Sequence, residues 1–431
     1  MSSVLIPLFH KNEERIHRLT SSFFNLFGIS LIVFTAAAYF SIDTWIQWIA
    51  PGFDAAQKET TIEISKILLL SPLLMGLAAI LNSYIQARHQ FLAFALAPLM
   101  YNISVLVAIL LFAKQYGIFA PAWGAVVGSG MQLLINVIFA WKEDFQYRPI
   151  ISEWRTMLEA GKLLIPRVIS LMGTQLALTI EIAVASTLGS GMIAAYYFAD
   201  SLQNLPIALV GISIAIPAFT AMSSLHNKSE EKKSFDTLQR KLFQVLYIIM
   251  PITLISFFLA PLIVSTILES GAFGSDETAL VSTILQIFAL SFPFQAIIPL
   301  VSRYYFALQN TLYPLVFTLI SIGINIALVY TITDTFSVFG LAIAYIASAI
   351  TNSMLLILFL KKVSQFHINM KQTLSFFAPL LPLSFLSFSL SILYTSYQHT
   401  WISTSLSLGI FSIIILWAYF MLTQKQFKQL F

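Results

Sequence analysis

The residues of this chain best suited to chemistry are ionisable side chains inside long apolar stretches. Glu181 lies in the middle of TQLALTIEIAVAS, Arg167 precedes it in LIPRVIS, and Asp200 follows it in YYFADSLQNLP. An ionisable group inside a membrane-spanning helix costs roughly 2.5–3.5 kcal/mol on insertion scales and is therefore a functional candidate. We expect Glu181 to act in a polar cavity, with a structural, hydrogen-bonded carboxyl as the alternative. Arg167 and Asp200 lie nearer to helix ends, where a side chain can reach the interface instead.

A second group of residues is basic and lies at the ends of apolar stretches, namely Arg88, Arg240, Lys241 and Arg303. Guanidinium groups bind phosphate through paired hydrogen bonds. These residues, with Arg167, are candidates for a basic funnel that binds a phosphate-bearing headgroup. The alternative is the ordinary excess of positive charge in cytoplasmic loops. That excess also accounts for the net charge of +4, so no nucleic-acid partner is expected.

The composition shows which solvent these residues meet. Of the 431 residues, 58% are hydrophobic and 10% are charged, against roughly 25% charged residues in soluble domains. The mean hydropathy is +0.84. Cysteine is absent, and the histidines lack a ligand spacing, so no metal site is predicted. No P-loop, nucleophile elbow or carboxylate pair is present, so no catalytic residue is predicted and we expect a membrane transporter rather than an enzyme.

Spanning helices need roughly 20 mostly apolar residues, and about twelve stretches qualify. They run approximately over 20–41, 65–86, 93–113, 120–141, 162–188, 193–223, 242–265, 279–302, 313–333, 337–360, 374–395 and 402–423. The links between them are short. The sequence therefore predicts an all-α, polytopic integral membrane protein.

The distribution of lysine and arginine gives the orientation of these spans. If the N-terminus is cytoplasmic, the outside segments hold only Lys58, Lys66 and Lys114, while the other basic residues, apart from the intramembrane Arg167, fall inside. Because positive charge marks cytoplasmic loops, both termini are expected in the cytoplasm.

The apolar segment 2–9 is too short for a signal peptide and its basic residues follow it, so no cleaved signal is expected.

Two stretches of the chain resemble each other, 72–111 and 293–332. Each has a helix that opens on proline, a polar turn, and a second helix carrying Asn-Ile, with Asn102 in the first copy and Asn325 in the second. Copies six spans apart have the same orientation, which predicts parallel repeats; chance similarity between apolar segments is the alternative. The predicted organisation is an incomplete N-terminal lobe of four helices (1–141), a six-helix lobe (142–361), and a C-terminal helix pair with a tail (362–431).

Several segments resemble the MurJ/MviN lipid II flippase family, which belongs to the superfamily of multidrug, oligosaccharidyl-lipid and polysaccharide exporters. They are ILNSYIQARHQFLAFALAPLMYNI (80–103), YYFADSLQNLPIALVGISIAIPAF (196–219), ESGAF (269–273) and RYYFALQNTLYP (303–314). Members of that family have fourteen helices. The resemblance therefore implies that the first helix and most of the second are missing here, and Phe243 stands where the family has a cavity arginine.

The resemblance implies a flippase that exports undecaprenyl-pyrophosphate-linked peptidoglycan precursor across the bacterial inner membrane by alternating access. For Glu181 it also implies a role in cation coupling, and Asp200 and Asn325 are further cation-coupling candidates. A coupling cation or the membrane potential is the expected energy source, with no other cofactor. The expected partners are the lipid-linked precursor, membrane lipids and cell-wall synthesis proteins. The alternatives are transport of another polyprenyl-linked glycan or a small molecule, and a truncated scaffold that does not transport.

Overall fold

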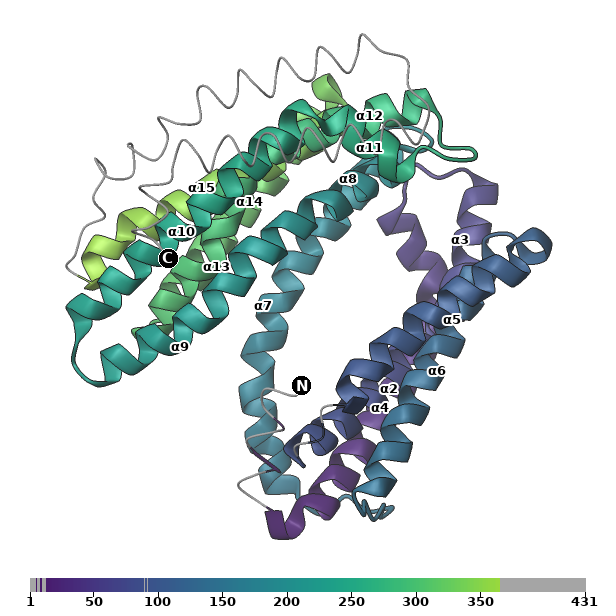
Figure 1. The fold of residues 1–431 in the computed structure, drawn as a ribbon. Helices are drawn as coiled ribbons and strands as arrows, with labels where there is room; N and C mark the ends of the chain where they lie inside the picture. The colour runs from purple at the N-terminus through teal and green to yellow at the C-terminus, as the bar shows by residue number, and fades with distance from the viewer. Residues whose placement is uncertain (1–4, 6–7, 10–12, 89, 91, 365–431) are drawn as a thin grey trace. The chain divides into compact units, whose positions relative to one another are not determined.

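The computed structural model describes residues 5, 8, 9, 13–88, 90 and 92–364, and the regular elements among them are all helical (Figure 1). After a short turn, η1 (Glu13–Arg15), the first helices are α2 (Ile16–Ile49), α3 (Ala55–Leu68), α4 (Leu70–Ala87), α5 (Leu92–Tyr116), α6 (Phe119–Lys142) and α7 (Trp154–Thr187). The remaining elements are α8 (Met192–Pro206), the π-helical turn η2 (Ile207–Ile212), α9 (Ser213–Asn227), α10 (Glu231–Phe258), α11 (Ala260–Leu268), α12 (Ser275–Ala289), α13 (Phe292–Ala307), α14 (Leu312–Phe336) and α15 (Val338–Ser364).

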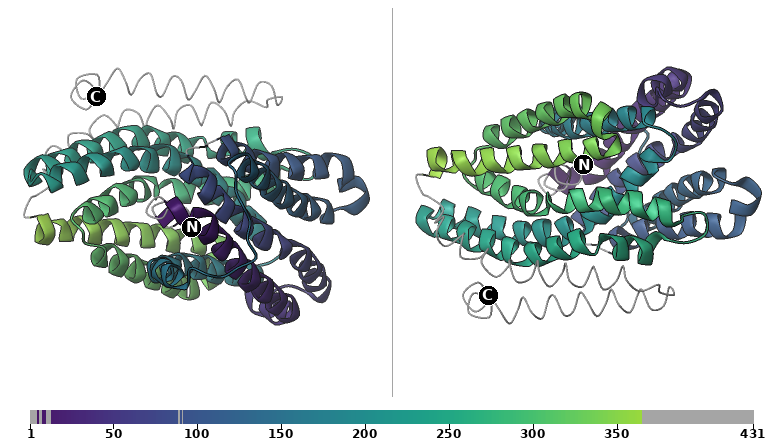
Figure 2. Two further views of the ribbon diagram at one scale, coloured as in Figure 1. Left: turned by 90° about the horizontal axis from the view of Figure 1, so that it is seen from below. Right: turned by 90° about the horizontal axis from the view of Figure 1, so that it is seen from above.

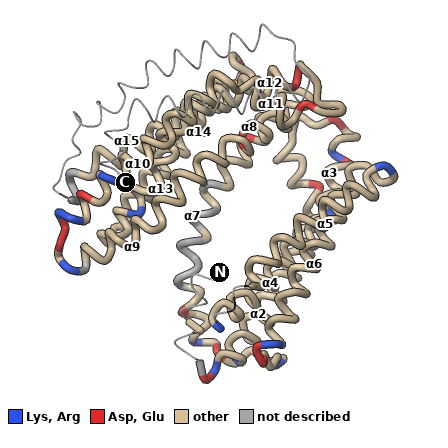
Figure 3. The backbone as a smooth tube through the Cα atoms, in the orientation of Figure 1, with Lys and Arg blue, Asp and Glu red and all other residues tan. Residues whose placement is uncertain are grey.

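The helices have the length and polarity of membrane spans. Within the described residues, 8 helices can cross a membrane by length and composition, or up to 9 if the bent pair α12–α13 forms one span. Charged residues gather at helix ends and in connections, while most of each described helix carries none (Figure 3). The helical membrane fold is thus as expected. The expected stretches 374–395 and 402–423 lie outside the described residues, so the number of twelve spans stays a prediction.

The chain divides into two compact units, residues 1–175 and 176–431, with the division inside α7. In unit 1, α5 packs along α6, α4 packs against both α6 and α2, and α3 contacts α2 and α6. Small residues allow the closest of these approaches. A Cβ added to Gly128 would lie 2.9 Å from the Tyr101 Cα atom, and one added to Gly124 would lie 2.6 Å from the Ala108 Cβ atom.

Unit 2 repeats this packing scheme. There α14 packs along α15, α13 packs against α15 and α10, and α12 contacts α15 and α11; Figure 2 shows the same helices from two further directions. The corresponding spans differ in continuity: α3 and α4 meet at Leu69 within one span, Ala55–Ala87, whereas a 47° bend separates α12 from α13. The correspondence of α4–α6 with α13–α15 supports the internal repeat that the sequence predicts. The predicted domain limits at 141/142 and 361/362 stay predictions.

Candidate functional site

A helical hairpin in unit 2 positions the intramembrane carboxylate Glu181. Helix α7 ends at Thr187, and two glycines with positive φ, Gly189 at 121° and Gly191 at 82°, turn the chain into α8. Such φ values favour glycine because it lacks a Cβ atom. The turn brings the Tyr196 hydroxyl to the Glu181 carboxylate, to which it donates a hydrogen bond of 2.9 Å. Glu181 is only 5% exposed and Tyr196 3%.

Asn325 of α14 completes the shell of this carboxylate. Its side chain hydrogen-bonds Glu181 and is 3% exposed. Its amide oxygen Oδ1 is buried and has no hydrogen-bond partner. A buried carboxylate is stable only when hydrogen-bond donors or cations compensate its lost hydration. Tyr196 and Asn325 therefore both donate to the Glu181 carboxylate, and the Asn325 oxygen Oδ1 stays without a partner.

Asp200 lies on the same helix as Tyr196 and within electrostatic range of Glu181. Two amides bind its carboxylate: Gln203 Nε2 donates at 2.8 Å and Asn204 Nδ2 at 3.0 Å. The Gln203 side chain is fully buried, and its oxygen Oε1 has no partner. The structure thus brings together Glu181, Asp200 and Asn325, the three cation-coupling candidates named from sequence.

Aromatic rings surround this polar group. The ring of Tyr196 lies 5.4 Å from that of Phe288 in α12, which lies 5.3 Å from that of Tyr345 in α15. Tyr345 also hydrogen-bonds Gln295 and lies within electrostatic range of both carboxylates. Sequence reasoning missed Tyr196 and Gln203 because neither is charged at neutral pH, so neither stands out as costly within a span. Their spacing from Asp200, four residues before and three after, places all three on one helix face and is the signal that could have found them.

The basic candidates are spread over both units. In unit 2, Arg240 is exposed on α10, Lys241 Nζ donates to Gln244 Oε1 at 2.8 Å, and Arg303 donates to the Pro299 carbonyl at 3.3 Å. Arg88 belongs to unit 1, where it ends α4. The Arg167 side chain lies outside the described part of the chain. None of these described basic side chains forms an ion pair with a described carboxylate.

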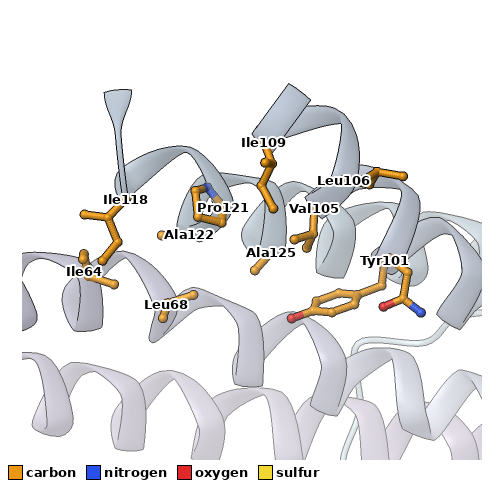
Figure 4. A pocket seen from close by; sticks show the side chains of 11 residues that line it. Ile64, Leu68, Tyr101, Val105, Leu106, Ile109, Ile118, Pro121, Ala122 and Ala125 are labelled. Atoms are coloured by element: carbon orange, nitrogen blue, oxygen red, sulfur yellow. The ribbon is translucent and has the colours of Figure 1, made fainter. Parts of the chain in front are cut away.

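Unit 1 has a cavity at the position that corresponds to the Glu181 site. It is lined by Ile64, Leu68, Tyr101, Asn102, Val105, Leu106, Ile109, Ile118, Pro121, Ala122 and Ala125, from α3, α5 and the segment that begins α6 (Figure 4). Its volume is about 500 Å³. Asn102 is the repeat counterpart of Asn325 but is exposed, and none of the residues lining this cavity is charged.

Comparison with known proteins identifies the family. The family model described as lipid II flippase MurJ matches residues 1–412. This chain belongs to the MurJ family. A probable lipid II flippase MurJ from Bdellovibrio bacteriovorus is 24% identical over 371 residues, which are 83% of this chain and 71% of that protein. A probable lipid II flippase MurJ from Rhizobium tropici is 26% identical over 358 residues, 80% of this chain and 67% of that protein.

Solved structures show the same fold. A lipid II flippase MurJ in an inward closed conformation matches with a TM-score of 0.84 and 23% identity, covering 99% of this chain and 88% of that one. An inward-facing multidrug resistance transporter of the MATE family matches with a TM-score of 0.75 and 14% identity, covering 84% of each chain. The fold of the two packed units is thus the one that these solved structures share.

Proposed function

We propose that this chain is a lipid II flippase, a membrane transporter that moves the polyprenyl-linked peptidoglycan precursor across the bacterial inner membrane. The match of the MurJ family model to residues 1–412 carries this proposal. The physical requirements agree with it. A pyrophosphate headgroup needs cationic and hydrogen-bonding partners along its path because an unpaired charge is costly away from water, while an apolar tail can stay in the lipid.

Reconstitution of the full chain with labelled lipid II in liposomes tests this function. We expect lipid II to become accessible on the opposite leaflet faster than in protein-free liposomes, and unlabelled lipid II to compete. Competition by a different polyprenyl-linked glycan but not by lipid II would favour a sister substrate, and antiport of a small organic cation would favour the multidrug branch. Absence of transport in folded protein would support a scaffold.

The Glu181 site is proposed to couple transport to a cation or to the membrane potential. Carboxylate and amide oxygens are the ligands preferred by hard cations, and the oxygens Asn325 Oδ1 and Gln203 Oε1 are buried without partners. Glu181 would hold the positive charge, Asn325 would share it, and Tyr196 would fix the orientation of the carboxylate. The headgroup candidates remain Arg88, Arg167, Arg240, Lys241 and Arg303.

Orientation in the membrane also belongs to the proposal, with both termini in the cytoplasm and cell-wall synthesis proteins as possible partners. Because the chain contains no cysteine, single cysteines can be labelled without background. We expect a cysteine at Asp276 to react with an impermeant maleimide in intact cells and one at Lys232 to react only after lysis. Labelling of position 232 from outside would contradict the orientation.

A further inference from the structure

A compact group of rings lies at the end of unit 1 where α2 begins and α4 ends. The Tyr84 ring of α4 lies 5.8 Å from the His17 ring of α2 and 5.1 Å from the Phe145 ring. The guanidinium of Arg88 lies over the Tyr84 ring, 5.7 Å from its centre. The Tyr84 ring therefore attracts the Arg88 guanidinium and also restricts its orientation.

Residues 145–152, here called the strap, connect α6 to α7 and are bound along α2. Asn25 Nδ2 donates to the carbonyls of Arg148 and Ile150, both at 3.0 Å, and the Tyr147 hydroxyl donates to Asn25 Oδ1 at 2.8 Å. The Arg148 backbone N–H donates to Ser21 Oγ at 3.1 Å. The backbone at Arg148 is therefore held on both sides, so this residue is fixed to α2.

The strap brings Arg148 to the same group as Arg88. Both arginines act electrostatically on His17, and neither has a described carboxylate within ion-pairing distance. The His17 Nδ1 atom is buried and has no hydrogen-bond partner. Asp144 also acts on His17 with the opposite sign, and its side chain is exposed. The group thus contains two guanidiniums without an ion pair, one of which also hydrogen-bonds Tyr84, the buried imidazole nitrogen of His17, and the carboxylates of Asp144 and Glu143, the second acting on Tyr84.

We propose that Arg88 and Arg148, together with His17, form a binding site for the diphosphate group of a polyprenyl lipid. Paired guanidiniums on different segments match the several oxygens of a diphosphate. The Tyr84 ring orients the Arg88 guanidinium, and the bonds to α2 hold the backbone of Arg148. The charge pattern assigns this end of unit 1 to the cytoplasm, where the substrate of a flippase is captured. The site rests on the proposed function and adds Arg148 and His17 to the headgroup residues.

The test measures binding of farnesyl diphosphate, a short prenyl diphosphate, to the full chain in phosphatidylcholine nanodiscs. We expect Arg88→Ala and Arg148→Ala each to weaken binding at least fivefold, and the lysine variants to recover part of it. Arg155→Ala is the matched control, because Arg155 is exposed in the first turn of α7 and lies outside the group; it should change binding less than twofold. Glutamine variants repeat the test if an alanine variant is less stable to heat.

A second arm predicts an effect of opposite sign. Asp144 has φ of 57°, in the left-handed region that asparagine tolerates well, so Asp144→Asn should keep the backbone while removing the carboxylate that acts on His17. We expect it to tighten diphosphate binding about twofold. Asn25→Ala loosens the strap but keeps both guanidinium groups in the protein, and should weaken binding less than either arginine variant does.

Two outcomes would overturn the site while leaving the flippase function standing: wild-type protein that transports lipid II but does not bind the probe, or both alanine variants binding like wild type. Nanodiscs with added phosphatidylglycerol separate the two sources of lipid phosphate. If the arginine variants lose enrichment of phosphatidylglycerol but keep diphosphate affinity, the site holds bulk phospholipid and the proposal is wrong. If the wild type does not transport lipid II, the proposed function is wrong, whatever the binding measurements show for the site.

Discussion

Asn102 and Asn325 occupy corresponding positions in two similarly packed units, yet their surroundings differ. In unit 2, Asn325 is buried and hydrogen-bonds Glu181 of α7, which also accepts a hydrogen bond from Tyr196 of α8. In unit 1, Asn102 is exposed beside a cavity of about 500 Å³ whose lining residues carry no charge. The helices that frame the two places, α3, α5 and α6 against α12, α14 and α15, have the same contacts with one another.

The difference shows that the repeated helices, here called the frame, set the packing in both units. The side chains placed between these helices determine the chemistry. A carboxylate placed in the frame of unit 2 requires Tyr196 and Asn325 as donors, because a buried charge without partners is unstable. In unit 1 no charged residue lines the cavity, so Asn102 has no charged partner among the lining residues. We therefore propose that unit 2 couples transport to a cation or to the membrane potential, while unit 1 is proposed to capture the headgroup at its opposite, basic end.

The largest expected effect tests the shared frame itself. A Cβ at Gly128 would lie 2.9 Å from the Tyr101 Cα and carbonyl oxygen, and one at Gly340 in unit 2 would lie 2.9 Å from the Thr333 Cα. Backbone cannot move aside easily, so Gly128→Val and Gly340→Val should each destabilise the fold by about 3 kcal/mol or more. Thermal unfolding in detergent measures this. Gly130→Ala is the control, because nothing lies within 4 Å of its added Cβ; equal loss in the control would break the comparison.

The next effect separates the two asparagines. Asn325→Leu removes a donor to the buried Glu181 carboxylate, and we expect the rate of lipid II transport to fall at least tenfold. Asn102→Leu removes an exposed amide and should leave the rate within twofold. Both variants should be expressed at wild-type levels. Equal losses in both would mean that the two units contribute alike and that the assignment of coupling to unit 2 is wrong.

A smaller effect is expected when the hydrogen bond from Tyr196 to Glu181 is removed. Tyr196→Phe keeps the ring contact with Phe288 but removes the hydroxyl that donates to the carboxylate. Loss of one of two donors to a buried acceptor costs about 1–3 kcal/mol, and the carboxylate also loses its fixed orientation. We expect transport to slow a few-fold and stability to fall by that amount. Tyr197→Phe, on the exposed face of the same helix, should change neither quantity.

The sequence predicts much of this, for reasons that particular residues show. Glu181 is visible because a carboxylate in an apolar stretch is expensive, and Asn325 because it recurs in a repeat with Asn102. Tyr196 is not visible in that way, since a tyrosine in a span carries no such cost. The predicted spans 65–86 and 193–223 each lie within one continuous span, Ala55–Ala87 and Met192–His226. The boundary between α3 and α4 and the π-helical turn η2 were not predicted, because the hydropathy continues through them. The contact of Arg88 with the group around the strap depends on tertiary packing, which no local pattern encodes.

The most direct test of the central claim measures lipid II translocation in proteoliposomes with and without imposed sodium or proton gradients, comparing wild type with Glu181→Gln and Glu181→Asp. The account predicts that one gradient accelerates the wild type, that Glu181→Asp keeps part of both rate and response, and that Glu181→Gln is slow and insensitive to either gradient. Expression and thermal stability should match the wild type. A Glu181→Gln variant that transports lipid II at the normal rate, with the normal response to the gradient, would contradict the claim that the charge of Glu181 couples transport.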